Sequence, residues 1–283
     1  MQLSPAQRAI VAAAGRVVLF VVLVLVFAAV FEGLLSAPLA RLANRLGPGI
    51  KLGPLLQLLA VGTATVVIVR MIDRRPWSEL ALGRDAARWP AFGEGLAAGA
   101  LTACIASLVL LAVGMLHFTP SAPAGGWLAA AARVSLVLVP AALAEELLCR
   151  GYLLTVFGSA IGRWGAVVLT SAAFGLLHLA NPGATATSVT VVTLSGAFLA
   201  LLRLALGSVY AAWMAHLAWN WIIAVALHAT LSGLRFESPG YSVVTSGPAW
   251  IAGGSWGPEG GVVAALGMLG ATYFYARRRR EES

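Results

Sequence analysis

The chain is poor in charged residues. Of its 283 residues, 11% are Asp, Glu, Lys or Arg, whereas 60% are hydrophobic. A water-soluble domain of this length carries about 25% charged residues to cover its surface. The shortage excludes an ordinary soluble protein and indicates that a lipid bilayer solvates much of the chain.

Lysine and cysteine are scarce as well. Lys51 is the single lysine among 19 basic residues. The net charge of +8 lies in short arginine runs beside apolar segments, where it sets membrane orientation, so we expect no nucleic-acid partner. The two cysteines, Cys104 and Cys149, exclude a disulfide framework and a CxxC metal site. This arginine bias and the richness in Ala and Gly suggest a GC-rich bacterial genome.

Long apolar runs dominate what is present, and no soluble domain or internal repeat interrupts them. We therefore predict an all-α, polytopic membrane protein with about eight transmembrane helices. Only Gly207-Ser208 separates the sixth run from the seventh, which predicts a tight helical hairpin. The eight runs are 9–31, 53–72, 93–116, 127–148, 164–180, 184–206, 208–230 and 260–276.

The distribution of arginine predicts the orientation. The 73–92 loop and the tail from Arg277 to Arg280 are basic, whereas the 117–126, 181–183 and 231–259 connections hold one basic residue, Arg235. The positive-inside rule then places both termini and the 73–92 loop in the cytoplasm, in a multi-pass protein of the bacterial cytoplasmic membrane.

The N-terminal segment contains one conflict with this orientation. Arg41, Arg45 and Lys51 would lie outside, unless residues 34–46 form an amphipathic helix on the membrane surface, and the sequence does not decide the topology of 34–51. The first run resembles a signal peptide, but no small-x-small site ends its core. We predict an uncleaved helix.

Three polar clusters interrupt the apolar runs, and the first is Glu145-Glu146…Arg150. Ionisable groups within a membrane seldom persist without a partner or a task. Glu146 and Arg150 are one helical turn apart with the acid first, the favourable order for an ion pair. Glu145 points about 100° away and has no local partner, so it is a candidate for taking and returning protons. The structural alternative is two carboxylates sharing one arginine.

The other two clusters are Phe174…His178 and His216…Asn220. His178 alone is weak, because a single histidine on an apolar helix is usually a hydrogen-bonded core residue. His216 and Asn220 lie on one face, so both can donate to one bound atom and stabilise an oxyanion. Their alternative role is polar contact between helices. By helix rise all three clusters can meet at mid-depth.

The motifs EExxxR, FxxxH and HxxxN, in this order on successive membrane helices, closely resemble the CPBP family of intramembrane proteases. This is the Abi-type group of CAAX prenyl proteases and bacteriocin-processing enzymes. The resemblance implies that Glu145 and His178 activate a water, that His216 and Asn220 hold the oxyanion, and that Glu146, Arg150 and Phe174 support the site.

The resemblance also suggests three parts of the chain. Residues 1–126 are helices without a family signature, and 127–230 are the catalytic core. Residues 231–283 form an external loop, the last membrane helix and a basic tail. His117 in a loop and His228 near a membrane boundary are expected to be bystanders.

The predicted function is an intramembrane endopeptidase that hydrolyses a membrane-associated protein or peptide without a cofactor. A zinc protease is the mechanistic alternative, with Glu145, His178 and His216 as ligands and no HExxH helix. A non-enzymatic scaffold or bacteriocin-immunity protein is the alternative from another class. A transporter is disfavoured because no repeated halves are found, and no GxSxG motif competes. Substrate identity and oligomeric state are not indicated.

Overall fold

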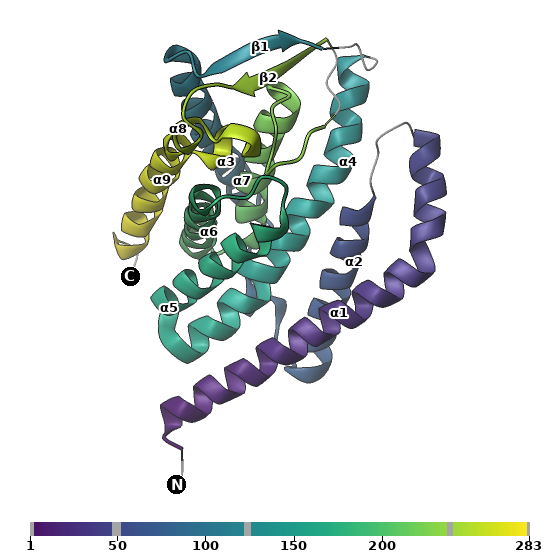
Figure 1. Cartoon of the computed structure of the whole chain (residues 1–283). Coiled ribbons are helices and arrows are strands. Elements are labelled where there is room, and N and C mark those ends of the chain that lie inside the picture. Colours follow the sequence, from purple (N-terminus) through teal and green to yellow (C-terminus); the bar gives the residue numbers. More distant parts are fainter. Residues whose placement is uncertain (1–2, 47–51, 122–125, 237–239, 282–283) are drawn as a thin grey trace.

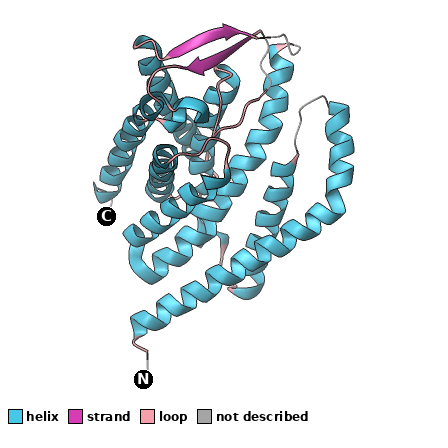
Figure 2. Ribbon diagram, in the orientation of Figure 1, coloured by secondary structure: helices cyan, strands magenta, loops and turns pink. Residues whose placement is uncertain are grey.

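The computed structural model describes residues 3–46, 52–121, 126–236 and 240–281. Within these residues the chain is a bundle of helices with one two-stranded sheet at one end (Figure 2). The predicted fold class, an all-α polytopic membrane protein, is confirmed.

The N-terminal helix lies along one side of the bundle (Figure 1). α1 (Pro5–Leu46) packs against α2 (Gly53–Val66) and α5 (Leu154–Leu177). Only 6% of its most apolar stretch is buried by the protein, as expected for a helix that faces lipid. After α2 come the π-helix η1 (Val67–Ile72), the short η2 (Trp77–Leu80) and α3 (Trp89–Ala112).

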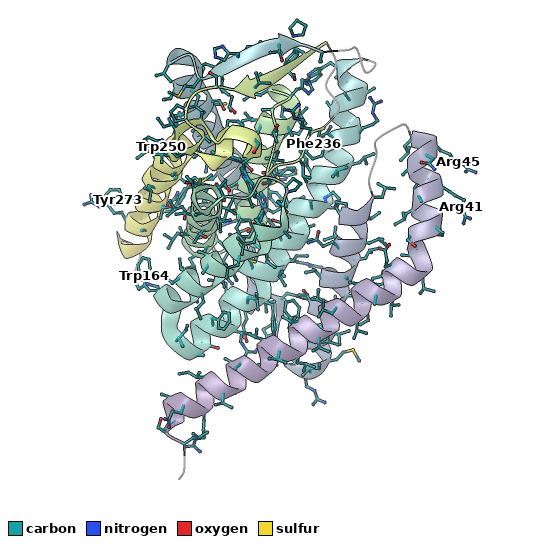
Figure 3. The ribbon with its side chains drawn as sticks, in the orientation of Figure 1. Arg41, Arg45, Trp164, Phe236, Trp250 and Tyr273 are labelled. Atoms are coloured by element: carbon teal, nitrogen blue, oxygen red, sulfur yellow. The ribbon has the colours of Figure 1, made fainter. Side chains whose placement is uncertain are left out.

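The end of α1 changes direction. Its last turns, which carry Arg41 and Arg45, run at an angle to the rest (Figure 3), and Pro38 lies inside the helix. Proline removes one backbone hydrogen bond and bends a helix. Residues 34–46 belong to α1 and are helical. Their position on the membrane surface stays a prediction. Lys51 lies outside the described residues.

Two predicted membrane spans share one continuous helical stretch. α4 (Trp127–Glu146) passes directly into the π-helix η3 (Leu147–Leu153) and then into α5. Within α5 the chain reverses at Gly162, whose φ of 75° is a conformation that glycine adopts at little cost. This reversal lies between the predicted runs 127–148 and 164–180. α5 ends in the short η4 (His178–Ala180).

The predicted tight hairpin is also confirmed. α6 (Ala186–Leu206) ends at Gly207, which has a left-handed φ of 59°, and α7 (Val209–Trp221) begins at once. The Ser208 hydroxyl accepts a hydrogen bond from the Ala211 amide and so caps α7. α7 continues as the π-helix η5 (Ile222–Ala226).

A small sheet was not predicted. β1 (Leu116–Pro120) pairs antiparallel with β2 (Tyr241–Thr245), in segments that we expected to be plain connections. Partners such as Thr119 and Ser242 are 123 residues apart, so no local pattern indicates their pairing. The chain then forms α8 (Ala249–Ala252), η6 (Gly254–Trp256), η7 (Pro258–Gly260) and α9 (Val262–Glu281).

The arginine-poor connections and the arginine-rich 73–92 loop were predicted to lie on opposite sides of the membrane, and they lie at opposite ends of the bundle. The β1–β2 pairing joins the 117–126 and 231–259 connections, and the Asn181 amide donates to the Ser232 carbonyl at 3.1 Å. At the other end, the Ser208 hydroxyl donates to the Ala86 carbonyl at 2.7 Å, so the 73–92 loop lies beside the 207–208 turn. This grouping is confirmed, whereas the choice of the cytoplasmic side stays a prediction.

Six helical stretches of the described residues are long and apolar enough to cross a membrane, where we predicted about eight spans. The stretch Trp127–Ala180 reverses at Gly162 and therefore holds two predicted spans. The predicted span 260–276 lies on α9 and is not among the six. α9 packs against α6 and α3, on the opposite side of the bundle from α1 (Figure 1).

Glycine permits the close contact between α3 and α7. A Cβ atom at Gly95 would overlap the backbone of Ala211, and one at Gly99 would overlap the carbonyl of Ala215. Small residues at such positions allow two helix backbones to approach. Because Ala215 precedes His216, this contact fixes the helix that carries the third motif.

Candidate active site

The first motif lies where α4 becomes the π-helix η3. Arg150 Nη1 donates to Glu146 Oε1 at 3.2 Å, and both side chains are completely buried. Arg150 Nη2 donates to the Gly196 carbonyl on α6 at 3.1 Å, and the guanidinium lies 4.2 Å from the centre of the Phe174 ring. The predicted Glu146–Arg150 pair is confirmed, and it also joins α6 and α5 to this helix.

Glu146 has a second partner that the motif spacing did not predict. His216 Nδ1 lies 2.8 Å from the same oxygen, Glu146 Oε1. A carboxylate in this pair only accepts, so Nδ1 carries the proton and the ring is held with Nε2 pointing elsewhere. Glu146 therefore orients the histidine of the third motif from a position 70 residues earlier in the chain.

Glu145 is bonded quite differently. Its Oε2 atom is buried and has no hydrogen-bond partner in the part of the chain that the structure describes. This oxygen lies 4.0 Å from His178 Nε2 and 4.0 Å from His216 Nε2. The side chain is 25% exposed. Both predicted histidines therefore face the carboxylate of Glu145.

His178 is held in a matching way. It is the first residue after α5, and its Nδ1 lies 2.8 Å from the Phe174 carbonyl. A carbonyl only accepts, so Nδ1 is protonated here too, and Nε2 faces Glu145. The Phe174 ring lies 4.9 Å from the His178 ring and 5.8 Å from the His216 ring. Phe174 therefore packs against both imidazoles.

A narrow pocket, partly open to its surroundings, adjoins these groups. Phe174, His178, His216 and Asn220 are among its lining residues. Glu145 does not line the pocket itself, but its Oε2 lies 4.0 Å from Nε2 of His178 and of His216, which do. The Asn220 amide lines the pocket, and no hydrogen bond of its side chain is found within the described segments. Its donors are therefore available to a bound molecule.

Sequence reasoning missed the other side of this pocket. Ser232, Glu259 and Met268 also line it, so the segment predicted as an external loop folds back onto the core. Trp256, which is 1% exposed, packs with Cys149, Phe174 and Val192. Glu259 lies in a run of glycine and proline, Gly257-Pro258-Glu259-Gly260-Gly261, which has no helical periodicity to mark it.

The two bystander histidines lie away from the cluster. His117 is on β1, is exposed, and forms a 2.8 Å hydrogen bond with the Ser246 hydroxyl. His228 was expected at a membrane boundary, but it is buried, with its ring centre 4.8 Å from that of Tyr241. Burial lowers the pKa of His228 below its ordinary value, because it disfavours the charged imidazolium.

The residue types of a zinc site are present, but their spacing is wide. Glu145, His178 and His216 form a His₂-carboxylate set. Ligands at about 2.0 Å from a tetrahedral zinc lie roughly 3.3 Å apart, against the 4.0 Å found here. No group of three or more His, Cys, Asp or Glu in the described ranges is arranged to hold a metal ion. In this conformation the three side chains do not fit one zinc.

Comparison with known proteins identifies the segment that holds these motifs. Residues 125–222 match a family model described as type II CAAX prenyl endopeptidase Rce1-like. No curated protein and no solved structure matches the chain. The matched segment includes all seven motif residues and excludes Ser232 and Glu259. The predicted resemblance is thereby confirmed: residues 125–222 are similar to the Rce1-like CAAX proteases of the CPBP family, which supports a function as an intramembrane endopeptidase.

Proposed function

We propose that this protein hydrolyses a peptide bond of a membrane-associated protein or peptide, using a water molecule activated by Glu145 and His178. One observation carries the proposal: Glu145 Oε2 has no hydrogen-bond partner among the residues that the structure describes, and it faces two imidazole nitrogens at 4.0 Å. A water about 2.8 Å from two atoms at this separation sees them at an angle of about 90°, a good hydrogen-bonding geometry.

The protonation states of the histidines define their parts in the reaction. Because each Nδ1 donates to an acceptor, each neutral ring has a lone pair on Nε2. Three acceptors then face one space, and a water has only two protons to donate. One acceptor would therefore lack a proton. A proton on Nε2 of His216 supplies it, and the nearby carboxylates of Glu145 and Glu146 favour that protonated imidazolium.

In the proposed reaction the water oxygen attacks the carbonyl carbon while its proton passes to Glu145, assisted by His178. The carbonyl oxygen becomes an oxyanion, which accepts hydrogen bonds from His216 Nε2–H and the Asn220 amide. Collapse of this intermediate breaks the C–N bond, and Glu145 returns the proton to the leaving amine. No covalent enzyme intermediate is formed.

The test is hydrolysis by the purified protein in detergent of a peptide library, with wild type beside Glu145→Gln. Glu32→Gln is a matched control, because Glu32 is an exposed carboxylate on α1. We expect cleavage by wild type and by Glu32→Gln, and none by Glu145→Gln. Equal cleavage by all three proteins would remove Glu145 from the mechanism.

Zinc hydrolysis is the second candidate, because Glu145, His178 and His216 are residue types that bind zinc, although their spacing in this conformation does not fit one ion. Elemental analysis of active protein separates the two mechanisms. We expect no stoichiometric metal and full activity after chelation with 1,10-phenanthroline. A stoichiometric zinc whose removal abolishes hydrolysis and whose return restores it would replace the glutamate mechanism and leave the reaction class unchanged.

We also place the protein in the bacterial cytoplasmic membrane, with the 73–92 loop and both termini in the cytoplasm. The arginine-rich composition and the grouping of the basic connections at one end of the bundle support this placement. Accessibility of single cysteines in the 73–92 loop and in 231–236, measured on intact cells, tests it.

A further inference from the structure

The pocket has an acidic wall opposite the motif residues. Glu259 lies in η7, is 6% exposed, and lines the same pocket as His178, His216 and Asn220. Glu259 lies outside residues 125–222 and has no part in the reaction proposed above. A buried carboxylate in a pocket wall needs a reason, because charge is costly to bury without compensation.

Neutral groups hold this carboxylate. Glu259 Oε1 accepts hydrogen bonds from the Ser232 amide at 2.8 Å and the Ser232 hydroxyl at 2.6 Å, and Oε2 accepts one from Trp219 Nε1 at 2.9 Å. A carboxylate offers about four acceptor positions. One position therefore remains, on Oε2, beside Trp219, the residue that precedes Asn220 on α7.

The charge of Glu259 is not balanced by a cation. No Lys, Arg or His among the described residues forms an ion pair with it. The two other acids with nearly buried side chains, Glu146 and Asp73, pair with Arg150 and Arg16. Glu259 differs from both because it lines a pocket and has no cationic partner among the described residues.

The wall is fixed in place, so Glu259 has a defined position. The Ser232 carbonyl accepts from the Asn181 amide at 3.1 Å, which connects the wall to the turn after His178. Three residues before Glu259, Trp256 is buried against the core. A rigid carboxylate presents its free acceptor position without a further ordering cost.

We propose that Glu259 forms an acidic subsite that binds a basic side chain, lysine or arginine, of the peptide substrate. An ammonium or guanidinium supplies both the missing charge and the missing donor on Oε2. This inference rests on the proposed function, since it concerns the specificity of the same pocket.

Binding to a catalytically inactive protein tests the subsite without requiring cleavage. In a Glu145→Gln background, fluorescent apolar peptides with one lysine moved along the sequence are compared with the same peptides carrying acetyl-lysine, which removes the charge. At one position we expect lysine to bind about tenfold more tightly, as for a desolvated charge pair. Adding Glu259→Gln should abolish the difference, whereas Glu259→Asp should retain part of it.

Ser232→Ala is the matched control for damage to the wall. It removes the 2.6 Å hydroxyl hydrogen bond but leaves the charge of Glu259 in place. We expect a lower melting temperature with the lysine preference retained. Equal affinity for lysine and acetyl-lysine at every position overturns the proposal, as does a preference that survives Glu259→Gln or disappears equally in Ser232→Ala.

Hydrolysis of the same peptides by otherwise wild-type protein separates this inference from the proposed function. Cleavage without any preference for lysine rejects the acidic subsite and retains the protease. Lysine-selective binding without cleavage retains the subsite and rejects the protease.

Discussion

Glu145 and Glu146 are adjacent in sequence, yet their surroundings are opposite. Glu146 is completely buried, and its Oε1 is shared between Arg150 and His216. Glu145 is 25% exposed, and its Oε2 has no hydrogen-bond partner among the described residues. The difference arises from the helix, because consecutive residues point about 100° apart.

The comparison suggests different roles for the carboxylates of Glu145 and Glu146. A carboxylate that accepts from a guanidinium and an imidazole is stabilised in its charged form and positions its partners. A carboxylate without donors is free to exchange a proton with a bound water. Two glutamates can thus have different roles in one site. Each role can be tested by neutralising one of the two carboxylates at a time.

The largest effect on activity is expected from Glu145→Gln. Loss of the proposed general base should lower kcat by about 10²- to 10⁴-fold. The melting temperature in detergent should stay near the wild-type value, because Oε2 has no hydrogen bond to lose within the described residues. Residual activity above a few per cent, or clear destabilisation, would break the contrast with Glu146.

Glu146→Gln should mainly destabilise the protein. Breaking a buried ion pair costs about 3–5 kcal/mol, and Arg150 and His216 both lose the negative charge that they face. Glu79→Gln is the matched control, since Arg75–Glu79 has the same spacing of four residues at 3.4 Å on the surface, where such pairs contribute about 0–1 kcal/mol. Similar melting temperatures for the two variants would show that the buried pair has no special weight.

Asn220→Ala should act on the rate alone. Losing one oxyanion donor costs about 10²- to 10³-fold in kcat, with KM nearly unchanged. Ser195→Ala, in the wall of the same pocket, is the control and should leave kcat near wild type. A change confined to KM would assign Asn220 to substrate binding, a role unlike those of both Glu145 and Glu146.

Gly99→Ala should have the smallest effect, by moving α7. The new Cβ would overlap the Ala215 carbonyl, at a cost of about 1–3 kcal/mol, and would shift His216 relative to Glu146. Gly93→Ala on the same helix has no atom within 4 Å of the added Cβ and is the control. If both variants keep full activity and stability, the α3–α7 contact does not hold the His216–Glu146 bond.

Much of this site follows from local spacing. The four-residue spacing of Glu146 and Arg150 predicts their pairing, and the helical period predicts that Glu145 points away. Gly207-Ser208 marks the hairpin, because glycine ends helices and serine begins them. Each inference needs only neighbours within one or two turns.

The remaining features depend on contacts between distant segments. His216 and Glu146 are 70 residues apart, and Trp219 and Glu259 are 40 apart, so no periodicity links them. The β1–β2 pairing also joins segments from far apart in the chain. Glu259 lacked any signal because its loop has neither an apolar period nor a motif partner nearby.

The π-helix η3 makes the number of residues in this helix as important as their identity. A π-turn holds more residues per turn than an α-turn. Removing one residue after Arg150, from Gly151 to Leu153, would restore α-helical register and rotate everything before the deletion by about 100° relative to everything after it. Every letter of the three motifs would still be present, but Glu145 would no longer face the histidines. The geometry of the site therefore depends on the number of residues in η3. Substitutions in this segment keep that number, whereas a deletion changes it.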